Sequence, residues 1–246
     1  MKSVEIITLV YKSKEWTKFI VDQMKEFGYA KDWMVQCRVV ANDPEVKGLL
    51  DYPRSQGVGV SVYNDPNPED YYINRVYRCW NWAGKTSPAE YICFVNSDMA
   101  FAPGWLDNLL RYAKEGLIPT SRLVESGKIP SGLHALVQNF GRTPQTFDME
   151  GWLEYAIANA IDLYQYGGLY MPVVFKQKLF QGTGYPEGNL YEDGVGTLNG
   201  PVKASGDAYY FAALRHAFGM RHITVFNSMV YHVQEGEMDA PQSSAE

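Results

Sequence analysis

Short apolar runs alternate with segments of helical periodicity through the first half of the chain. Four of the runs predict strands, at residues 4–11, 36–41, 58–63 and 91–95. Between them, apolar residues recur every three or four positions up to Gly28 and again over about residues 68–83, which predicts helices. The run Tyr91–Val95 is apolar throughout, as is typical of a strand covered on both faces. The pattern therefore predicts an α/β protein with an open, mostly parallel sheet and helices on both faces.

The second half of the chain predicts longer connections. Helices are expected over about residues 104–115, 148–163 and 207–218, and strands at 117–124, at 169–175 and within 222–233. Residues 125–147 have no regular period, and residues 181–205 form a glycine-rich segment whose length is typical of a lid or binding loop. No change of composition marks a second domain, so we expect one domain followed by a disordered tail from Glu235.

Composition narrows the classes of function. No stretch approaches the roughly 20 apolar residues of a membrane span, and the first residues lack a signal-peptide core, so a cytoplasmic protein without a membrane span is expected. The three cysteines, Cys37, Cys79 and Cys93, have no C-x-x-C spacing, which indicates neither a disulfide framework nor a zinc cluster. The net charge of −6 argues against broad nucleic-acid affinity. A phosphate-bearing ligand would need a local binding device.

Polar residues follow several of the predicted strands. They are Thr8–Tyr11, Asn42-Asp43, Asn64-Asp65 and Asn96-Ser97-Asp98. In an open α/β sheet, ligands bind beyond the carboxyl ends of the strands, so these residues predict a site at one edge of the sheet.

Asp98 is the most informative of these residues. Pro103 suits the first turn of the next helix, which puts the capping position near Ala102 and leaves Asp98 about a turn too early to cap it. Mg²⁺ or Mn²⁺ typically takes one or two protein carboxylates and completes its shell with phosphate oxygens and water. The position of Asp98 therefore predicts that its side chain binds a metal. The alternative is a turn aspartate bonded to its own backbone.

Five segments together resemble a known family. In chain order they are VEIITLVYKSKEW, RVVANDP, YICFVNSDMAFAPGWLDNLL, GGLYMPVVFKQKLFQGTGYPEG and SGDAYYFAALRHAFG with a later VYH. They are similar to family 2 glycosyltransferases of the GT-A fold over about residues 3–235. The resemblance implies one Rossmann-like domain at 1–235, with a nucleotide-binding half at about 1–115 and an acceptor and catalytic half at about 116–235. Residues 236–246 would form the tail.

The resemblance also implies how a nucleotide-sugar is held. Asp98 matches the last aspartate of the family's Asp-x-Asp motif, which binds the Mn²⁺ or Mg²⁺ that bridges the donor diphosphate. Asn96 stands where many members have the first aspartate, and Ser97 lies between the two. The remaining matches are Asp43 for the base or ribose, Thr8, Val10 and Tyr11 for base packing, and Asn74-Arg75 on the helix that approaches the diphosphate.

Two further residues acquire roles from the resemblance. Asp207, at the start of a late helix, matches the general base that deprotonates the acceptor, although Gly206 stands where the family often has Glu. An ordinary helix cap is the alternative for Asp207, and Glu192-Asp193 is a rival pair. His232 is similar to the late histidine that some members use as a second metal ligand, whereas a core histidine is the structural alternative.

The implied activity is a metal-assisted transfer of a sugar from a UDP-, GDP- or dTDP-linked donor to an acceptor hydroxyl, with inversion. A saccharide, a lipid-linked sugar, a protein or a nucleic-acid base all remain open as the acceptor. A dinucleotide oxidoreductase and a P-loop phosphotransferase lack their glycine motifs here. The open alternatives are a sugar-phosphate nucleotidyltransferase, whose usual glycine-rich opening loop is missing, and a non-catalytic nucleotide-sugar-binding module, favoured by Gly206 and Asn96.

Overall fold

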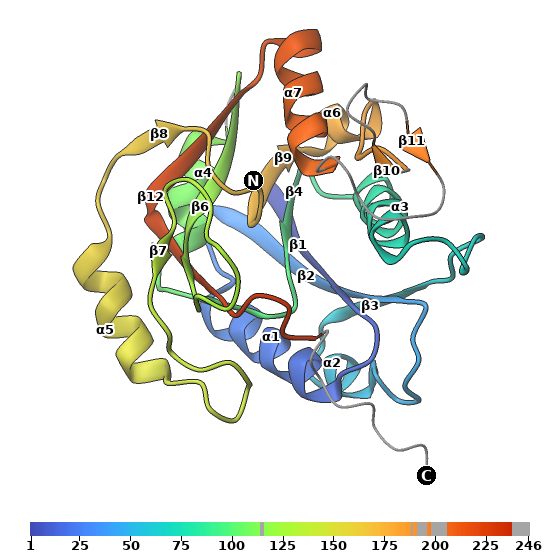
Figure 1. The fold of residues 1–246 in the computed structure, drawn as a ribbon, viewed down its shortest axis with the longest axis horizontal. Helices are drawn as coiled ribbons and strands as arrows, with labels where there is room; N and C mark the ends of the chain where they lie inside the picture. Colours follow the sequence, from blue (N-terminus) through green and yellow to red (C-terminus); the bar gives the residue numbers. More distant parts are fainter. Residues whose placement is uncertain (114–115, 188, 191–195, 198–205, 238–246) are drawn as a thin grey trace.

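A computed structural model describes residues 1–113, 116–187, 189–190, 196–197 and 206–237 (Figure 1). The strands are β1 (Lys2–Val10), β2 (Trp33–Asn42), β3 (Gly59–Tyr63), β4 (Tyr91–Val95), β5 (Met99–Phe101), β6 (Leu117–Glu125), β7 (Leu136–Val137), β8 (Tyr164–Tyr166), β9 (Val173–Lys176), β10 (Asn189–Leu190), β11 (Gly196–Thr197) and β12 (Arg221–His232). The helices are α1 (Lys14–Phe27), α2 (Asp51–Ser55), α3 (Tyr72–Lys85), α4 (Trp105–Tyr112), α5 (Met149–Asn159), α6 (Gln177–Gln181) and α7 (Gly206–Phe218).

The central sheet has the strand order β3-β2-β1-β4-β9-β6-β12-β5, with β7 beside β6 and β8 beside β12. The four N-terminal strands of this order pair in parallel, as expected for strands joined through helices. Strand β9 then runs antiparallel to β4 and β6, while β12 is parallel to β6. The predicted α/β class and mostly parallel sheet are confirmed. The parallel arrangement brings the ends of β1, β2 and β4 to one edge.

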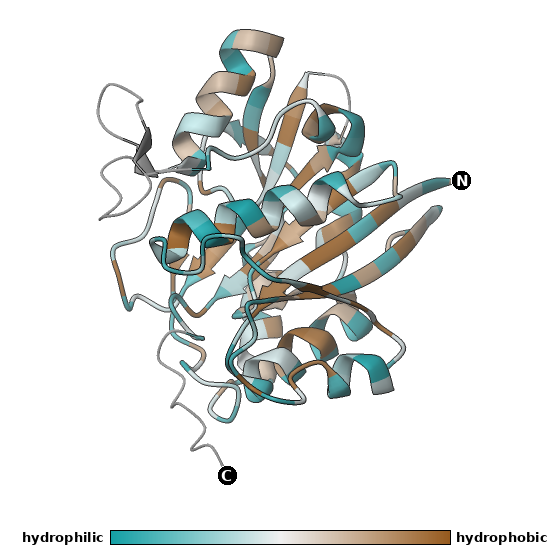
Figure 2. Ribbon diagram, turned by 90° about the vertical axis from the view of Figure 1, so that its right-hand side faces the viewer, coloured by the Kyte–Doolittle hydropathy of each residue, from teal (hydrophilic) through white to brown (hydrophobic). Residues whose placement is uncertain are grey.

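Both faces of the sheet are buried, which explains the unbroken apolar runs. Neighbouring residues of β1 point to opposite faces, so Ile6 packs with α1 and α4 whereas Ile7 packs with α3, α6 and α7. Figure 2 shows the apolar strands enclosed between helices. A third cluster forms around Trp152 of α5 and Tyr231 of β12. The side chains of Trp152 and Tyr231 are fully buried, so α5 is held against the β12 end of the sheet.

Several short elements were missed by the periodicity. Helices α2 and α6 have five residues each and strands β5 and β8 have three, too few to show a period. The helix expected over 148–163 ends at Asn159, because residues 164–166 pair with β12 instead. Strand β5 pairs antiparallel with the end of β12. This last pairing matters most, because it places the residue before β5, Asp98, next to His232.

The sequence predicts no disulfide framework and no membrane span, and both expectations can be compared with the described part of the chain. Cys37, Cys79 and Cys93 are all free thiols there. None of the helices in the described segments has the length and apolar character needed to cross a bilayer.

Candidate active site

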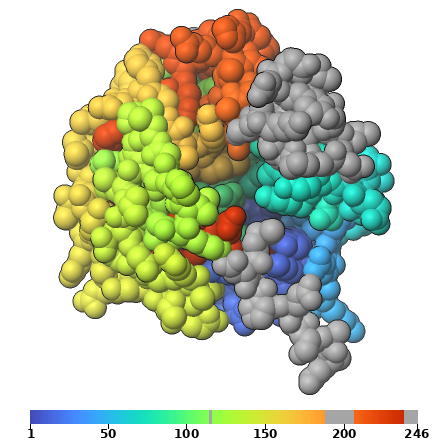
Figure 3. Space-filling view, viewed as in Figure 1, coloured from blue at the N-terminus to red at the C-terminus, as the bar shows by residue number. Residues whose placement is uncertain are grey.

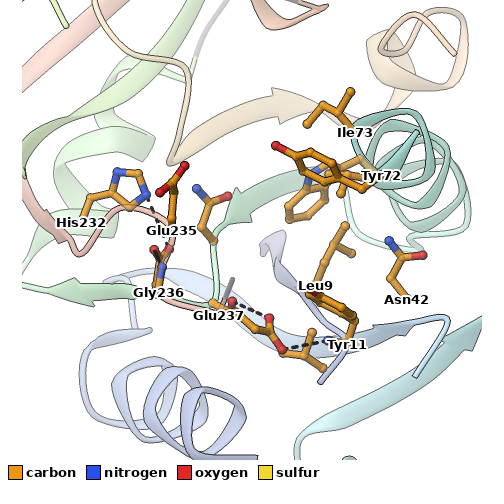
Figure 4. A pocket seen from close by; sticks show the side chains of 15 residues that line it. Leu9, Tyr11, Asn42, Tyr72, Ile73, His232, Glu235, Gly236 and Glu237 are labelled. Atoms are coloured by element: carbon orange, nitrogen blue, oxygen red, sulfur yellow. Dashed lines mark hydrogen bonds and ion pairs between the residues drawn. The ribbon is translucent and has the colours of Figure 1, made fainter. Parts of the chain in front are cut away.

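A cavity of about 240 Å³ lies at the carboxyl ends of β1, β2 and β4. The hollow at the centre of Figure 3 lies where the N-terminal strands, α3 and the end of the described chain meet, and Figure 4 shows its lining. The lining residues are Leu9, Val10, Tyr11, Asn42, Tyr72, Ile73, Val76, Trp80, Asn96, Ser97, Asp98, His232, Glu235, Gly236 and Glu237. A cavity therefore lies at the predicted edge of the sheet, and it draws lining residues from both halves of the chain.

Asp98 is held at the floor of this cavity by both its backbone and its side chain. Its carbonyl oxygen accepts a hydrogen bond from the backbone N–H of Val233 at 3.1 Å, which continues the β5–β12 pairing. Its carboxylate accepts a bond from the N–H of Gly236 at 3.0 Å and lies 3.5 Å from Nε2 of His232. The side chain is buried. The carboxylate also accepts a bond from its own backbone N–H, as the alternative expected, but the structure in addition brings it together with His232 and Gly236.

His232 lies between two carboxylates. Its Nδ1 is 3.3 Å from Oε1 of Glu125, on the side opposite Asp98. Burial by itself would lower the pKa of His232, but the charges and hydrogen bonds of Asp98 and Glu125 outweigh burial and raise it to about 9. In the same way, burial opposes ionisation of Asp98 and Glu125, yet the contact with His232 holds the pKa of each carboxyl below its ordinary value. The set is thus two carboxylates around one imidazolium, with an overall negative charge.

This arrangement fits a hard divalent cation. Asp98 offers a carboxylate oxygen at the cavity floor, and His232 would offer Nε2 once a bound cation displaced its proton. The surplus negative charge of the cluster favours a cation there. Within the described residues, no group of three or more His, Cys, Asp or Glu side chains is arranged to hold a metal alone. The two ligands are therefore enough only if phosphate oxygens and water complete the shell, which is the usual coordination of Mg²⁺ and Mn²⁺.

The last described residues of the chain form one wall of the cavity, and here the sequence expectation of a disordered tail from Glu235 is wrong for Gly236 and Glu237. The Glu237 carboxylate accepts hydrogen bonds from the backbone N–H groups of Tyr11, Lys12 and Ser13 at 3.0, 2.9 and 3.1 Å. Its other oxygen accepts from the Ser97 hydroxyl at 3.0 Å. We call residues 234–237 the strap.

Two local features allow the strap to pack against the start of α1, and neither is obvious from the sequence. Ser13 caps α1 by accepting a bond from the N–H of Trp16 at 3.2 Å, so the N–H groups that precede the helix face outward as a site for an anion. A Cβ on Gly236 would lie 2.7 Å from the Trp16 ring and 2.8 Å from the Cβ of Asp98, so only glycine fits there. The remaining residues of the expected tail, 238–246, lie outside the described residues.

The rest of the lining suits a nucleoside. Tyr11 and Tyr72 face the cavity from opposite sides in Figure 4. Val10, Ile73 and Trp80 add apolar surface to its lining. Aromatic faces with polar edges are well suited to stacking on a base. The cavity is smaller than the usual range of about 300–1,000 Å³ for small-molecule sites, so a nucleotide-sugar would extend beyond it.

Only some of the other residues predicted to bind the donor line the cavity. Val10, Tyr11, Asn96 and Ser97 line the cavity with Asp98, but Thr8 is fully buried inside the sheet and does not reach it. Asp43 and Arg75 lie beside the cavity and form an ion pair at 3.9 Å. Arg75 thus lies on α3 with its guanidinium directed toward Asp43, and its contact with a diphosphate stays a prediction.

Asp65, after the end of β3, does not line the cavity and takes part in a buried ion-pair network. The Asp65 carboxylate pairs with Nε of Arg78 at 2.9 Å, and Asp70 pairs with Nη1 of the same guanidinium at 2.7 Å. All three side chains are buried. This network fixes the start of α3, whose Tyr72, Ile73 and Val76 then line the cavity.

Asp207 does not line this cavity but lies next to α3, at the first turn of α7. Burial raises the pKa of Asp207 from 3.8 to about 6, although a hydrogen bond from Tyr77 opposes the shift. The side chain itself is half-buried. A carboxylate with a pKa near the working pH is suited to proton transfer. The rival pair Glu192 and Asp193 lies outside the described residues.

The unexpected glycine before Asp207 has a steric reason. A Cβ on Gly206 would approach the Tyr77 ring to 2.4 Å and its hydroxyl oxygen to 2.8 Å. Tyr77 in turn stacks on Tyr185, with ring centroids 5.3 Å apart and planes 12° from parallel. The place of a Glu side chain is thus filled by a tyrosine, which contacts Asp207.

Sequence reasoning missed several residues of this region. Ile73, Val76 and Trp80 were assigned only to a helix face, and their apolar spacing could identify that face but not the cavity; Tyr72 was not singled out. Glu125 and Glu237 had no signal, because each depends on strands or segments that are distant in the sequence.

Comparisons with known proteins agree on the fold. No protein-family model and no curated protein sequence matches this chain. Among solved structures, the mannosyltransferase PcManGT from Pyrobaculum calidifontis, in complex with GDP-Man and Mn²⁺, superposes with a TM-score of 0.57 and 14% identity over 98% of this chain and 58% of that one. S. aureus TarS 1-349 superposes with a TM-score of 0.59 and 13% identity, over 97% of this chain and 62% of that one.

A third neighbour is GalNAc-T7 with UDP, GalNAc and Mn²⁺, with a TM-score of 0.57 and 11% identity over 94% of this chain and 44% of that one. This chain thus spans about half to three-fifths of the length of these proteins. At such identities the likeness concerns the fold. The chain has the GT-A fold.

Proposed function

We propose that this protein is a divalent-metal-dependent glycosyltransferase that moves a sugar from a nucleotide-diphosphate donor to an acceptor hydroxyl. The observation that carries the proposal is the meeting of Asp98 and His232, at 3.5 Å, on the floor of a cavity with aromatic walls. Carboxylate and imidazole at the end of a buried strand match a cation-assisted diphosphate site. The GT-A fold supports the same reading, since two of its neighbours were solved with Mn²⁺ and a nucleotide or nucleotide-sugar.

Each part of the cavity has a role in this proposal. Tyr11 and Tyr72 hold the base, while Asn42 and the Asp43–Arg75 pair lie on the ribose side. Asp98 and His232 hold Mn²⁺ or Mg²⁺, with Asn96 and Ser97 beside them. The bound metal would supply Lewis-acid stabilisation of the charge on the leaving diphosphate. The donor is UDP- or GDP-linked by analogy with the structural neighbours, and a dTDP-linked donor fits the same chemistry.

Asp207 acts as the general base. It accepts the proton of the acceptor hydroxyl while that oxygen forms a bond to the anomeric carbon, and the bond from that carbon to the diphosphate oxygen breaks. One such displacement inverts the configuration. The pKa of about 6 leaves Asp207 ionised at neutral pH and close enough to that pH to accept a proton efficiently.

A donor panel tests the proposal without knowledge of the acceptor. The protein is incubated with UDP-, GDP- and dTDP-sugars, with and without Mn²⁺, and released nucleoside diphosphate is measured. We expect slow hydrolysis of at least one donor that requires the metal and is lost in Asp98→Asn. Metal-dependent binding of a donor without any turnover, with or without added saccharides, would instead identify a non-catalytic nucleotide-sugar-binding module.

A further inference from the structure

Glu237 joins two edges of the donor cavity through a single buried carboxylate. One of its oxygens, Oε1, accepts hydrogen bonds from the backbone N–H groups of Tyr11, Lys12 and Ser13, just after β1. The other, Oε2, accepts from the hydroxyl of Ser97, just after β4. Figure 4 shows the Glu237 side chain directed from the strap toward Tyr11. The carboxylate therefore fastens the end of the strap to the ends of two neighbouring strands.

The strap in turn holds the carboxylate of Asp98. The N–H of Gly236 donates to Oδ2 of Asp98 at 3.0 Å, whereas Oδ1 lies 3.5 Å from Nε2 of His232. Gly236 lies between the Trp16 ring and Asp98, in a space too small for a Cβ. The two oxygens of Asp98 are thereby distinguished, because the strap occupies Oδ2 while Oδ1 faces His232.

The start of the strap is strained and firmly held. Gln234 and Glu235 have left-handed φ values of 69° and 57°, which are unfavourable for residues with a side chain. The Gln234 amide accepts from the N–H groups of Lys128 and Ile129 at 2.9 and 3.3 Å and donates to the Ile129 carbonyl at 3.2 Å. Strain of this kind persists only where the surroundings fix it, and it is concentrated at functional sites. The loop after β6 thus fixes one end of the strap.

Contacts behind a metal ligand decide how that ligand is oriented. A carboxylate that binds a cation must direct an oxygen at the ion, and removal of a group that orients a ligand typically costs about 10–100-fold in metal affinity. The proposed metal site has two protein ligands, Asp98 and His232. A turn of the Asp98 carboxylate would therefore remove half of the protein's contribution.

We propose that Glu237 is a positioning residue for the metal site. It anchors the strap so that Gly236 fixes the Asp98 carboxylate with Oδ1 toward the cation. Glu237 acts through the strap and does not itself contact the cation, because both of its oxygens accept hydrogen bonds from the protein. The inference rests on the proposed metal-dependent function and adds a residue to it.

Binding of Mn²⁺ in the presence of UDP or GDP tests this role without any turnover. Electron paramagnetic resonance of free Mn²⁺ reports how much of the ion remains unbound. We expect Glu237→Ala to weaken Mn²⁺ binding by about 10–100-fold. Glu237→Gln should restore most of the affinity, because its amide oxygen still accepts from the N–H groups and its NH₂ can donate to the Ser97 hydroxyl. Ser97→Ala should cost less than about tenfold, the value of one hydrogen bond.

Two control variants separate the role of the strap from that of charge. Glu15→Ala removes an exposed carboxylate from the first turn of α1, close to where Glu237 binds, and should leave Mn²⁺ affinity unchanged. Arg215→Gln changes the charge of a separate cavity along α7, which Arg221 and Tyr166 also line, and it should likewise have no effect. Urea denaturation identifies conditions in which every variant is folded. The affinity for UDP without metal should change less than the affinity for Mn²⁺.

Several results would overturn the inference. An unchanged Mn²⁺ affinity in Glu237→Ala would show that Asp98 is oriented without the strap. Equal losses in Glu237→Ala and Glu237→Gln would show that the charge of Glu237 attracts the cation. Equal losses of Mn²⁺ affinity and of metal-free UDP affinity would indicate general damage to the cavity. All three leave the proposed function standing, whereas a native protein that binds no Mn²⁺ with either nucleotide would remove the proposed function itself.

Discussion

The edge of the sheet and the face of α7 represent two ways of building a site. At the sheet edge, Asp98 and Glu237 are buried and His232 is half-buried. Asp98 contacts His232 and a backbone N–H, and Glu237 accepts from three backbone N–H groups and a hydroxyl. At α7, Asp207 sits among aromatic rings with a raised pKa, and Arg215 and Arg221 are exposed. Protein contacts thus hold the polar groups of the first region in place, as the proposed nucleotide and cation site requires. In the second region Asp207 is poorly solvated, and Arg215 has no ion-pair partner among the described residues. Poorly satisfied charges are the ones with most to gain from a substrate.

The largest expected effect is at the sheet edge. Asp98→Asn retains the shape of the side chain but removes the negative charge beside His232. Loss of a metal ligand is expected to cost several kcal/mol of transition-state stabilisation, on the order of a 10³-fold loss in kcat/KM. Calorimetric titration of UDP and GDP with and without Mn²⁺ should show that the metal-dependent part of the affinity has gone. Asp51→Asn, an exposed carboxylate on α2, is the matched control. Unchanged metal dependence in Asp98→Asn would contradict the assignment.

Asp207→Asn should lower turnover but, unlike Asp98→Asn, leave metal-dependent nucleotide binding intact. A carboxylate general base contributes about 10²–10⁴-fold, so turnover should fall by that order while the Mn²⁺-dependent affinity for nucleotide stays as in the native protein. Together the two variants test whether the sheet edge binds the donor while α7 supplies the base. Near-normal turnover in Asp207→Asn would transfer the role of base to Glu192 or Asp193.

The same substitution should stabilise the fold at neutral pH. The pKa of Asp207 is raised from 3.8 to about 6, so the folded protein binds more protons than the unfolded chain between these values. Ionised Asp207 therefore destabilises the native state as pH rises through this range, by up to about 3 kcal/mol above pH 6. Chemical denaturation of Asp207→Asn should show a gain of that sign at pH 7 that disappears by about pH 4. A gain that persists at pH 4 would point to packing instead.

The strap is expected to contribute to stability at the sheet edge. Glu237→Ala removes the acceptor of three backbone N–H bonds and one hydroxyl bond, which should lower the free energy of unfolding by about 1–3 kcal/mol. Glu235→Ala is a close control, because its ion pair with Lys128 at 3.2 Å is half exposed and should be worth less than about 1 kcal/mol. Equal effects of the two variants in urea denaturation would show that the Glu237 contacts do not stabilise the fold.

The smallest predicted effect concerns the tuning of the base. The Tyr77 hydroxyl lowers the pKa of Asp207 by hydrogen bonding, against the larger effect of burial. Tyr77→Phe should therefore raise the pKa of Asp207 by about one unit or less, since a hydrogen bond is worth about 0.5–1.5 kcal/mol. Activity is lost as pH falls through this pKa, so the acidic limb of the kcat/KM profile should move to higher pH. A limb that stays in place would exclude Asp207 as the titrating group.

The sequence was most informative where local rules suffice. Period and capping predicted β1, α1 and the fully buried β4, because both faces of these strands and one face of each helix must be apolar. Asp98 could be singled out because it follows β4 without capping the next helix. Asp207 needed the family resemblance, since an aspartate at a helix start has a common structural explanation.

Other features depended on the path of the chain in space. Three-residue β5 is too short to show a period, yet its pairing with β12 is what brings Asp98 to His232. The resemblance suggested that both bind a metal, but Glu125, the third member, had no sequence signal. Gly206 seemed to weaken the catalytic reading, and only the position of the Tyr77 ring shows why no side chain fits there.

By itself, the sequence determined the α/β class, the alternation of strands and helices in the first half of the chain, and the edge of the sheet where polar residues collect. These follow from the alternation of side chains along a strand and from the fixed direction of parallel strands. Only the tertiary structure decided that residues 235–237 line the sheet-edge cavity and that a basic, aromatic cavity lies along α7. Both depend on contacts between residues far apart in the sequence, such as Ser97 with Glu237 and Tyr166 with Arg221, which no local pattern encodes.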